Sequence, residues 1–461
     1  MKIDHVDTGS LAPPPDDTGG RELWGSRIGF LLAAVGSAVG LGNMWRFSYT
    51  TAEHGGAAFV FFYILLTFLI GIPVMIAEFG LGRSTRRSPI GALRAAGGPA
   101  WIPLGLLFVS AGFLILGYYS VIAGWVTRYA VESLVSPFPP DAGDYFARVS
   151  SGIAPVLYHL AFMAIVVFIV AGGVKRGIER VSTLMMPVLA LIMIGLAVWA
   201  ATLVGAGEGY RFYLTPSFEE LLSLETIAAA SGQAFFSLSL GMGAMLTYAS
   251  YLPRSANLPR ESTIVALSDF GVAFIAGLVV FPVIFALGLQ AAVGESTLGA
   301  LFISLPGAFQ AMGTTGHIVG ALFFIALFIG AVTSGVSLLE VVTSSVIDET
   351  SISRRTAALA TGGIIAVIGV GPAVSLDILG AMDAIASDVF LPLGGLALAI
   401  LVGWGPPSRR IEAFTEGSSG FVRSIIGGWV WTIRIIVPPF LIIVLSHTIP
   451  VALEAVAAIG R

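Results

Sequence analysis

The strongest constraint on the fold of this chain is a series of long apolar runs that recur from one end of the sequence to the other. Each run is close to or longer than the ~20 residues that a helix needs to cross about 30 Å of hydrocarbon. Eleven such runs lie at residues 28–50, 57–81, 101–131, 154–173, 182–204, 225–250, 263–288, 318–346, 356–374, 378–403 and 425–448. A bilayer cannot satisfy open backbone groups, and the runs lack the alternation of barrel strands, so each is expected to be a helix. We therefore predict an all-α polytopic membrane protein with eleven transmembrane helices.

Composition and charge agree with this architecture. The chain has 461 residues, of which 56% are hydrophobic and 11% charged, and its mean hydropathy of +0.93 excludes a water-soluble domain. With the N-terminus in the cytoplasm, only Arg148, Arg211 and Arg461 of the loop lysines and arginines fall outside. Residues 1–26 are polar and rich in Pro, Gly and Asp, which predicts a flexible cytoplasmic tail. Eleven crossings then place the C-terminus outside.

Several classes of function are excluded or disfavoured. The chain has no cysteine, so disulfides, thiol catalysis and cysteine metal sites are absent. Its five histidines are scattered, and the sequence contains no HExxH pair, no GxSxG elbow and no phosphate loop with its lysine. The arginine clusters lie in short loops, where the excess of basic residues expected on the cytoplasmic side explains them. Nucleic acid is therefore not indicated as a partner. We expect a membrane protein that is not an enzyme, and the sequence leaves open whether it forms a homo-oligomer.

The first apolar run is interrupted by GSAVGLGNMWRF at residues 36–47, which contains three glycines, an asparagine and an arginine. Its GLGNM is echoed by GMGAM at 241–245, at the matching place in the sixth run. This near-repeat predicts two sets of five helices. Repeat 1 covers 27–205, repeat 2 covers 224–403, and helix 11 at 425–448 belongs to neither. Because five is odd, the second set must be inverted relative to the first. Inverted repeats with interrupted first helices predict a binding site at mid-membrane.

A helix that is unwound at 40–42 and at 241–243 would expose carbonyl groups that can coordinate a cation and amides that can hold a carboxylate. Irregular backbone of this kind survives in a membrane only around a cavity. The alternative interpretation is close helix packing through small residues, whose spacing Gly36 and Gly40 do have. Asn43, Ser237 and Ser239 lie beside the two breaks and favour a site.

The chain resembles the neurotransmitter:sodium symporter family, and within it prokaryotic amino-acid transporters such as the bacterial leucine transporter. The resemblance runs from about Arg21 to the eleventh run. The stretches that carry it are GSAVGLGNMWRF, GIPVMIAEFGLGR, KRGIER, GQAFFSLSLGMGAMLTYASY and GAVTSG. It implies sodium-coupled transport by alternating access across a prokaryotic plasma membrane, with helices 1 and 6 unwound.

The resemblance implies a first sodium site formed by the carbonyl of Ala38, the side chains of Asn43 and Ser237, and the carboxylate of the substrate. The family usually adds an asparagine from span seven, where this chain has Ser268 and Asp269, and we assign the role to Asp269. Its carboxylate would balance the charge of the ion and replace the chloride of animal relatives, so chloride is not expected to be required. An acid inside a membrane is costly unless it is paired. The alternative is that Asp269 lies in water near the cytoplasmic end.

The implied second sodium site uses the carbonyls of Gly36, Val39 and Gly330 with the hydroxyls of Thr333 and Ser334. Every donor in both sites is an oxygen, as an alkali cation needs. Taken alone, Thr333 and Ser334 have a simpler interpretation, in which each hydroxyl bonds to the backbone of its own helix.

The resemblance also predicts what the substrate is. Monoamine carriers of the family have an aspartate where this chain has Gly40, so the substrate is expected to supply its own carboxylate. The predicted contacts for the carboxylate, the amino group and the side chain come from Ala38, Leu41, Gly42, Ile115, Tyr119, Phe236, Ser237, Ser239, Met242, Ser334 and Leu338. The side-chain pocket is apolar and has no ionisable group, which favours a neutral, hydrophobic amino acid.

Two gates complete the implied machinery. Arg46 is expected to pair with Asp383 across the outer vestibule, above Phe236 as a lid. On the inner side, Arg21 is expected to pair with Asp348, with support from Trp24, Ser250 and Tyr251. Opening one pair while the other stays closed gives alternating access. For Arg21 the simpler interpretation is one more cytoplasmic positive charge.

The function predicted from the sequence is therefore sodium-coupled import of a neutral, hydrophobic L-amino acid. Two alternatives stay open. One is proton coupling through Asp269 or Glu78, and the other is a membrane sensor that binds an amino acid without transporting it. The sequence does not distinguish among individual amino acids or sodium stoichiometries.

Overall fold

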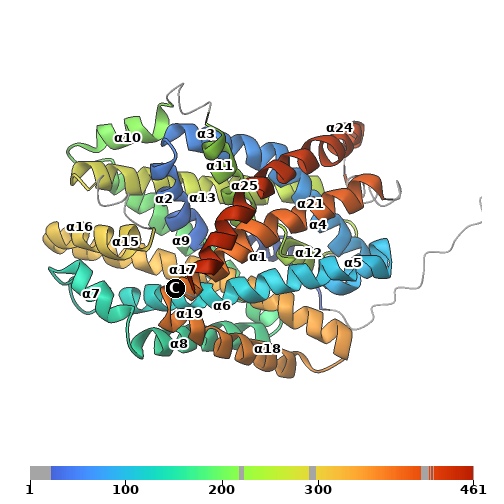
Figure 1. Ribbon diagram of the computed structural model, residues 1–461, viewed down its shortest axis with the longest axis horizontal. Helices are drawn as coiled ribbons and strands as arrows, with labels where there is room; N and C mark the ends of the chain where they lie inside the picture. The colour runs from blue at the N-terminus through green and yellow to red at the C-terminus, as the bar shows by residue number, and fades with distance from the viewer. Residues whose placement is uncertain are drawn as a thin grey trace, which may run out of the picture.

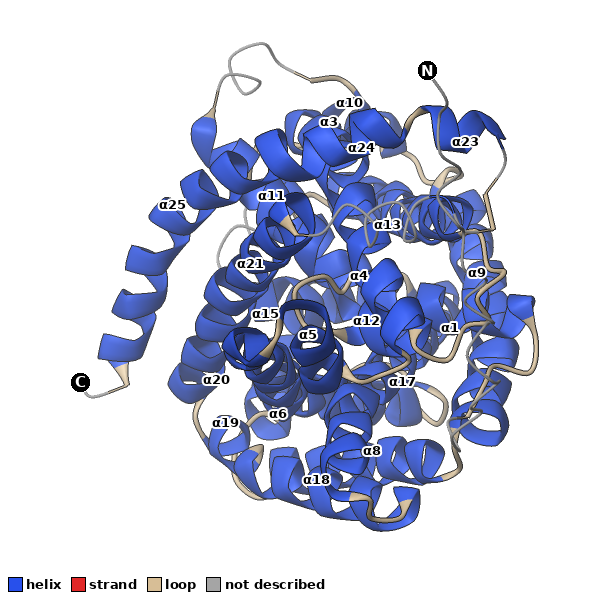
Figure 2. Cartoon of the chain, turned by 90° about the vertical axis from the view of Figure 1, so that its right-hand side faces the viewer, coloured by secondary structure: helices blue, strands red, loops and turns tan. Residues whose placement is uncertain are grey.

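The computed structural model describes residues 22–216, 223–289, 297–405, 415, 417–418 and 420–459, and within these ranges every regular element is a helix. The long helices lie side by side in one bundle (Figure 1), and helices joined by short loops make up the whole described chain (Figure 2). Arg21, one of the predicted gate residues, lies outside the described residues.

Nine helical stretches of the described chain are long and apolar enough to cross a membrane. They are Ala57–Thr85, Pro99–Ser133, Ala154–Ala171, Val174–Ala200, Leu258–Ala286, Gly313–Thr350, Arg354–Val374, Leu376–Trp404 and Ile426–Ala458. A tenth span is obtained when Arg27–Ala38 and Gly42–Glu53, which meet at an angle of 50°, are counted as one. The all-helical membrane architecture predicted from the sequence is thus confirmed, and the described chain has nine or ten spans by length and composition.

The regular elements of the described chain are α-helices and segments of π- or 3₁₀-helix, and the latter are labelled η. In the first half they are α1 (Arg27–Ala38), η1 (Gly42–Arg46), α2 (Phe47–Glu53), α3 (Ala57–Leu66), η2 (Thr67–Gly71), α4 (Ile72–Thr85), α5 (Pro89–Gly97), η3 (Pro99–Trp101), α6 (Ile102–Ser133), α7 (Ala142–Val149), α8 (Ala154–Ala171), η4 (Val174–Glu179), α9 (Arg180–Ala200) and α10 (Ala206–Leu214). In the second half they are α11 (Leu224–Ser237), α12 (Ala244–Ala249), α13 (Leu258–Ala286), α15 (Thr297–Gly299), η6 (Ala300–Ser304), α16 (Leu305–Ala311), α17 (Gly313–Thr350), α18 (Arg354–Ile368), α19 (Val370–Val374), α20 (Leu376–Asp383), η7 (Ala384–Phe390), α21 (Leu391–Trp404), α23 (Gly420–Ser424), α24 (Ile426–Trp431), η8 (Thr432–Ile436) and α25 (Val437–Ala458).

The sixth predicted span, 225–250, is represented by two short helices. α11 ends at Ser237, α12 begins at Ala244, and residues 238–243 between them form turns. Neither helix alone is long enough to cross a bilayer. The count of eleven spans therefore stays a prediction.

Helix α17 lies at the centre of the bundle, where 83% of its most apolar window is buried within the protein. It packs against α1, α6, α8, α9 and α18. By contrast, only 28% of the corresponding window of Val174–Ala200 is buried, so that span forms part of the outer surface of the bundle. At the outer edge of the bundle, α25 covers α21 (Figure 2). The buried α17 therefore packs against α1 and α12, which belong to the two interrupted spans.

Candidate functional site

The first span is interrupted near its middle. Helix α1 ends at Ala38, Val39 adopts an extended backbone with φ −75° and ψ 107°, and a π-helix begins at Gly42. Gly40 lies between the two halves, and a Cβ there would collide with Ser334 Oγ and approach Tyr119 Oη to 3.1 Å. Glycine thus lets side chains from α6 and α17 reach the exposed backbone of the break.

The second interruption, between α11 and α12, contains three residues with positive φ. These are Ser239 at 53°, Gly241 at 76° and Gly243 at 75°. Glu78 of α4 is completely buried beside this turn, where its carboxylate accepts from the amides of Gly241 at 2.8 Å and Leu246 at 3.2 Å. The carboxylate therefore supplies acceptors for amides that the interrupted helix leaves without a partner, and its charge suits the positive end of α12.

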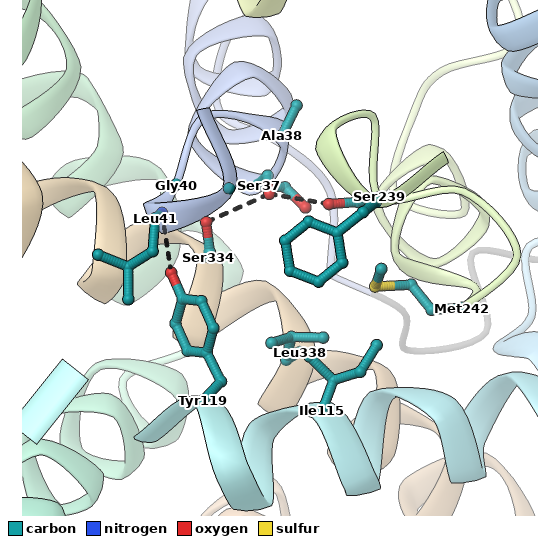
Figure 3. A pocket seen from close by; sticks show the side chains of 12 residues that line it. Ser37, Ala38, Gly40, Leu41, Ile115, Tyr119, Ser239, Met242, Ser334 and Leu338 are labelled. Atoms are coloured by element: carbon teal, nitrogen blue, oxygen red, sulfur yellow. Dashed lines mark hydrogen bonds between the residues drawn. The ribbon is translucent and has the colours of Figure 1, made fainter. Parts of the chain in front are cut away.

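A cavity lies between the two interruptions (Figure 3). Its lining residues are Ser37, Ala38, Gly40, Leu41, Gly42, Ile115, Tyr119, Phe236, Ser239, Met242, Ser334 and Leu338. No charged side chain is among them. Figure 3 shows the side chains of Ile115, Met242 and Leu338 on the side away from the backbone of Gly40 and Leu41. The cavity thus has one polar, backbone-lined end and one apolar end, a combination that suits a small amphipathic molecule.

Hydrogen bonds order the polar end of this cavity. The Leu41 amide donates to Tyr119 Oη at 3.4 Å, and the Ser239 hydroxyl donates to the Ser37 carbonyl at 2.9 Å (Figure 3). All the predicted substrate contacts line the cavity except Ser237, whose side chain points into a neighbouring polar cluster. Sequence reasoning missed Ser37 as a lining residue, although its position next to Ala38 in the interrupted run was a usable signal.

The neighbouring cluster gathers polar side chains around the Asp269 carboxylate, and we call it the Asp269 cluster. Asn43 Nδ2 donates to Asp269 Oδ1 at 2.7 Å and to Ser237 Oγ at 3.0 Å. The Ser237 hydroxyl lies 2.8 Å from Asp269 Oδ2, and the Tyr63 hydroxyl lies 3.0 Å from the same oxygen. Asn43 Oδ1 accepts from the Gly40 amide at 3.1 Å and keeps a second lone pair. The cluster therefore joins the first interruption to the second through α13.

Asp269 itself is completely buried, while Ser268 is partly exposed. The alternative in which Asp269 lies in water is therefore wrong for this structure. Tyr63 is a member of the cluster that the sequence analysis did not identify. It lies in the second apolar run, where nothing in its sequence neighbourhood distinguishes it from a packed aromatic residue.

A second group of oxygens lies on the other side of the first interruption. Ser334 Oγ is 3.4 Å from each of the carbonyl oxygens of Gly36, Ser37 and Val39. The Thr333 hydroxyl lies 3.1 Å from the Gly330 carbonyl and 3.2 Å from that of Ile329. The Ser334 hydroxyl thus faces the carbonyls of Gly36 and Val39 that were predicted to share a site with it, while the Thr333 hydroxyl has the backbone hydrogen bond that the simpler interpretation expects.

Comparison with known proteins identifies the kind of molecule that carries these features. A model of the Sodium:neurotransmitter symporter family matches residues 21–151 and 145–454. The chain belongs to the sodium:neurotransmitter symporter family. This confirms the resemblance predicted from the sequence, and the members of this family are transporters rather than enzymes.

Individual relatives of this symporter agree with the family match. The uncharacterised sodium-dependent transporter YhdH of Bacillus subtilis is 35% identical, over 92% of this chain and 97% of the relative. The uncharacterised sodium-dependent transporter MJ1319 of Methanocaldococcus jannaschii is 36% identical, over 83% and 82%. Among solved structures, MhsT in complex with L-phenylalanine superimposes with a TM-score of 0.85 at 40% identity, covering 93% of this chain and 100% of MhsT. The symporter therefore shares its fold with an amino-acid-bound relative.

Outside the cavity, the symporter has a larger hollow that includes Arg46, Gln233, Asp383 and Asp388 in its lining. The guanidinium of Arg46 stacks over the ring of Phe236 at 4.8 Å from its centroid, and Phe236 also lines the cavity. Arg46 Nη1 lies 3.6 Å from Asp383, the predicted partner, but Arg46 Nη2 lies closer to Asp388, at 3.1 Å. The sequence analysis did not identify Asp388. The Arg46 and Phe236 pair separates the cavity from the outer hollow.

A second large hollow lies on the other side of the cavity. Asp348, which lines it, accepts from the Ser88 amide at 2.6 Å, and its predicted partner Arg21 lies outside the described residues. Trp24 donates from Nε1 to the Tyr248 carbonyl at 2.9 Å and packs edge-on against Tyr251. Trp24 and Tyr251, both expected to support the inner gate, therefore lie in contact, and their role in a gate stays a prediction.

The hydroxyl of Tyr251 leads to an ionic chain that sequence reasoning missed. It donates to Glu340 Oε1 at 2.5 Å, and the other oxygen of Glu340 is 2.7 Å from Arg354 Nη1. Arg354 Nε in turn lies 3.1 Å from Glu22. Glu340 is completely buried in α17, whereas Glu22 precedes α1. This chain of contacts ties the start of the first span to α17 and α18, and only the fold brings its members together.

Proposed function

We propose that this symporter imports a neutral, hydrophobic L-amino acid together with sodium by alternating access. The observation that carries the proposal is the cavity between the two helix interruptions, which has exposed backbone at one end, apolar side chains at the other and no charged side chain in its lining. A zwitterion would have both its charges met by backbone groups and by a bound cation. An acidic or basic side chain would find no counter-charge in this lining, and its desolvation would be costly.

For the substrate we propose an orientation that follows this polarity. The carboxylate would contact the amides of Leu41 and Gly42 and the Tyr119 hydroxyl. The amino group would face the carbonyls of Ala38, Phe236 and Ser237 and the Ser239 hydroxyl. The side chain would lie among Ile115, Phe236, Met242 and Leu338, with Ser334 beside the backbone end. Support comes from MhsT, a relative of similar fold whose structure is described as a complex with L-phenylalanine.

Two sodium sites are proposed next to the substrate. The first comprises Ala38, Asn43, Ser237 and Asp269 with the substrate carboxylate, and the second comprises Gly36, Val39, Gly330, Thr333 and Ser334. Both sets consist of oxygen donors, which hard alkali cations prefer. The buried Asp269 would supply the negative charge beside the first ion, so we propose that chloride is not required.

For the architecture we propose eleven spans, made of repeat 1 at 27–205, the inverted repeat 2 at 224–403 and helix 11 at 425–448. The interruptions in helices 1 and 6 would be the unwound segments of the two repeats. The tail at 1–26 would lie in the cytoplasm and the C-terminus outside, in the plasma membrane of a prokaryote. The excess of basic residues in the loops assigned to the cytoplasm supports this orientation.

In the proposed cycle, sodium and substrate bind together because the substrate carboxylate completes the first sodium shell. Each then raises the affinity of the other by the same factor. Arg46 with Asp383 would close the outer side, and Arg21 with Asp348 the inner side, with Trp24 and Tyr251 in support. The sodium gradient and the membrane potential, worth about 2.3 kcal/mol per charge per 100 mV, would drive uptake.

Uptake of labelled amino acids into proteoliposomes tests this proposal. With sodium outside, L-phenylalanine or L-leucine is expected to accumulate at least about tenfold above the level with potassium outside, while L-glutamate and L-lysine are excluded. Accumulation that ignores sodium but follows a pH gradient would indicate proton coupling. Specific binding without any uptake would indicate a sensor, and either result would contradict the proposal.

A further inference from the structure

The outer hollow holds two carboxylates beside one guanidinium. Arg46 Nη2 hydrogen bonds to Asp388 Oδ1 at 3.1 Å, whereas the distance from Arg46 Nη1 to Asp383 Oδ1 is 3.6 Å. Nη1 is buried and has no hydrogen-bond partner within the described part of the chain. In this conformation the guanidinium is therefore hydrogen-bonded to Asp388 and forms a longer ion pair with Asp383.

A local change of helix geometry explains how both acids face the same arginine. Asp383 ends α20, and the next seven residues, Ala384–Phe390, form the π-helix η7. In an α-helix, residues five apart point about 140° away from each other, because five residues advance well beyond one turn of 3.6. In a π-helix the backbone bonds run from i to i+5, so residues five apart lie one turn above one another. The π-helix thus aligns Asp388 with Asp383.

The two carboxylates differ in their other contacts. Asp383 Oδ1 accepts from the hydroxyls of Tyr118 and Ser387, each at 2.7 Å, so part of its acceptor capacity is already used. The side chain of Asp388 is 28% exposed, against 37% for Asp383. In addition, the Asp388 carbonyl accepts from the Thr448 hydroxyl of α25 at 2.6 Å, which attaches this turn of η7 to the neighbouring helix. Asp388 is therefore the less exposed acid, and its backbone is attached to α25, whereas the Asp383 carboxylate is held by Tyr118 of α6.

We propose that Asp388 is a second acid of the outer gate, which holds Arg46 over Phe236 both in this conformation and when Arg46 Nη1 hydrogen bonds to Asp383. It is a positioning residue for the lid, because it acts on the cavity through Arg46 and Phe236. The inference rests on the proposed outer gate and adds to it a step in which Arg46 Nη1 closes onto Asp383 while Nη2 stays on Asp388. A gate with one acid would release Arg46 completely when that contact broke.

Chemical labelling at the outer hollow tests this role. The natural chain has no cysteine, so Ala229→Cys, in the lining of the outer hollow, provides a single reporter. An uncharged polyethylene-glycol maleimide avoids effects of the altered charge on the reagent. The labelling rate is measured with sodium and L-phenylalanine, and again in potassium alone. Asp388→Asn is expected to raise the rate about tenfold under both conditions, and Asp383→Asn to raise it less. Asp377→Asn, which removes an exposed acid of α20 outside this hollow, should leave the rate unchanged.

Two further variants keep the test decisive if Asp388→Asn does not fold. Asp388→Glu should recover part of the slow labelling. Thr448→Val keeps the Asp388 carboxylate but removes the hydrogen bond to the Asp388 backbone carbonyl, and it should raise the rate by less than Asp388→Asn. The inference is overturned if Asp388→Asn labels at the rate of Asp377→Asn under both conditions, or, should Asp388→Asn not fold, if Thr448→Val has no effect. If sodium and L-phenylalanine do not slow labelling of the Ala229→Cys protein that carries no other substitution, this result would count against the proposed function. The comparison of Asp388→Asn with Asp377→Asn would still decide the present inference.

Discussion

Replacing Asp269 by Asn should weaken sodium binding by about one to two orders of magnitude in chloride-free buffer. The substitution removes a buried carboxylate to which Asn43, Ser237 and Tyr63 now donate. Two opposite unit charges about 4 Å apart at an effective dielectric constant of about 20 interact by about 4 kcal/mol. Losing only a third of this energy would cost a factor of about ten in affinity. The sodium concentration that gives half-maximal uptake of L-phenylalanine measures the effect.

The same variant tests the predicted independence from chloride. In Asp269→Asn, the donors of Asn43, Ser237 and Tyr63 would face a neutral group, and an added anion could take the place of the lost charge. Uptake by the variant should therefore recover in part when gluconate is replaced by chloride, whereas the unaltered protein should not respond. Ser268→Ala, at the partly exposed neighbouring position, is the matched control. If Ser268→Ala impaired sodium dependence and Asp269→Asn did not, the assignment of the first sodium site would be wrong.

Replacing Glu78 by Leu should be the most destabilising single change in this site. It leaves the amides of Gly241 and Leu246 buried without their acceptor, at about 1–3 kcal/mol for each unsatisfied group, or about 2–6 kcal/mol together. Glu78→Gln keeps one acceptor oxygen and should lie between Glu78→Leu and the unaltered protein. Loss of the monodisperse chromatographic peak on heating in detergent gives the order of the apparent melting temperatures.

Glu208→Gln is the control for Glu78→Leu, because the Glu208 side chain is 67% exposed and its contact with Arg211 is long, at 3.8 Å. It is expected to change stability by less than about 0.5 kcal/mol. A Glu78→Leu protein as stable as the Glu208→Gln protein would show that the interrupted sixth helix does not depend on the carboxylate.

The interruptions could be predicted from the sequence because they are local. Glycines at Gly40, Gly241 and Gly243 weaken a helix wherever they occur, and in the structure these positions coincide with the end of α1 and the turn between α11 and α12. The apolar end of the cavity followed from the family resemblance, which assigned Ile115, Met242 and Leu338 to the side-chain pocket, and the three residues lie together in the lining.

What sequence reasoning missed depends on contacts between distant segments. Asp388 reaches Arg46 only because η7 changes the helical repeat, and nothing in AIASDVF distinguishes a π-helix from an α-helix. The link between Glu340 and Arg354 needs the packing of α17 against α18. In each case the residue types were visible in the sequence, but their geometry was set by tertiary structure.

The account depends on the claim that the amino acid and sodium share one site, formed where the two helices are interrupted. Equilibrium binding of labelled L-phenylalanine to the purified protein, with sodium replaced stepwise by potassium at constant ionic strength, tests this claim most directly. We expect the Kd for L-phenylalanine to fall at least about tenfold as sodium saturates, and saturating L-phenylalanine to lower the Kd for sodium by the same factor. A Kd for L-phenylalanine that stays constant at every sodium concentration would contradict it.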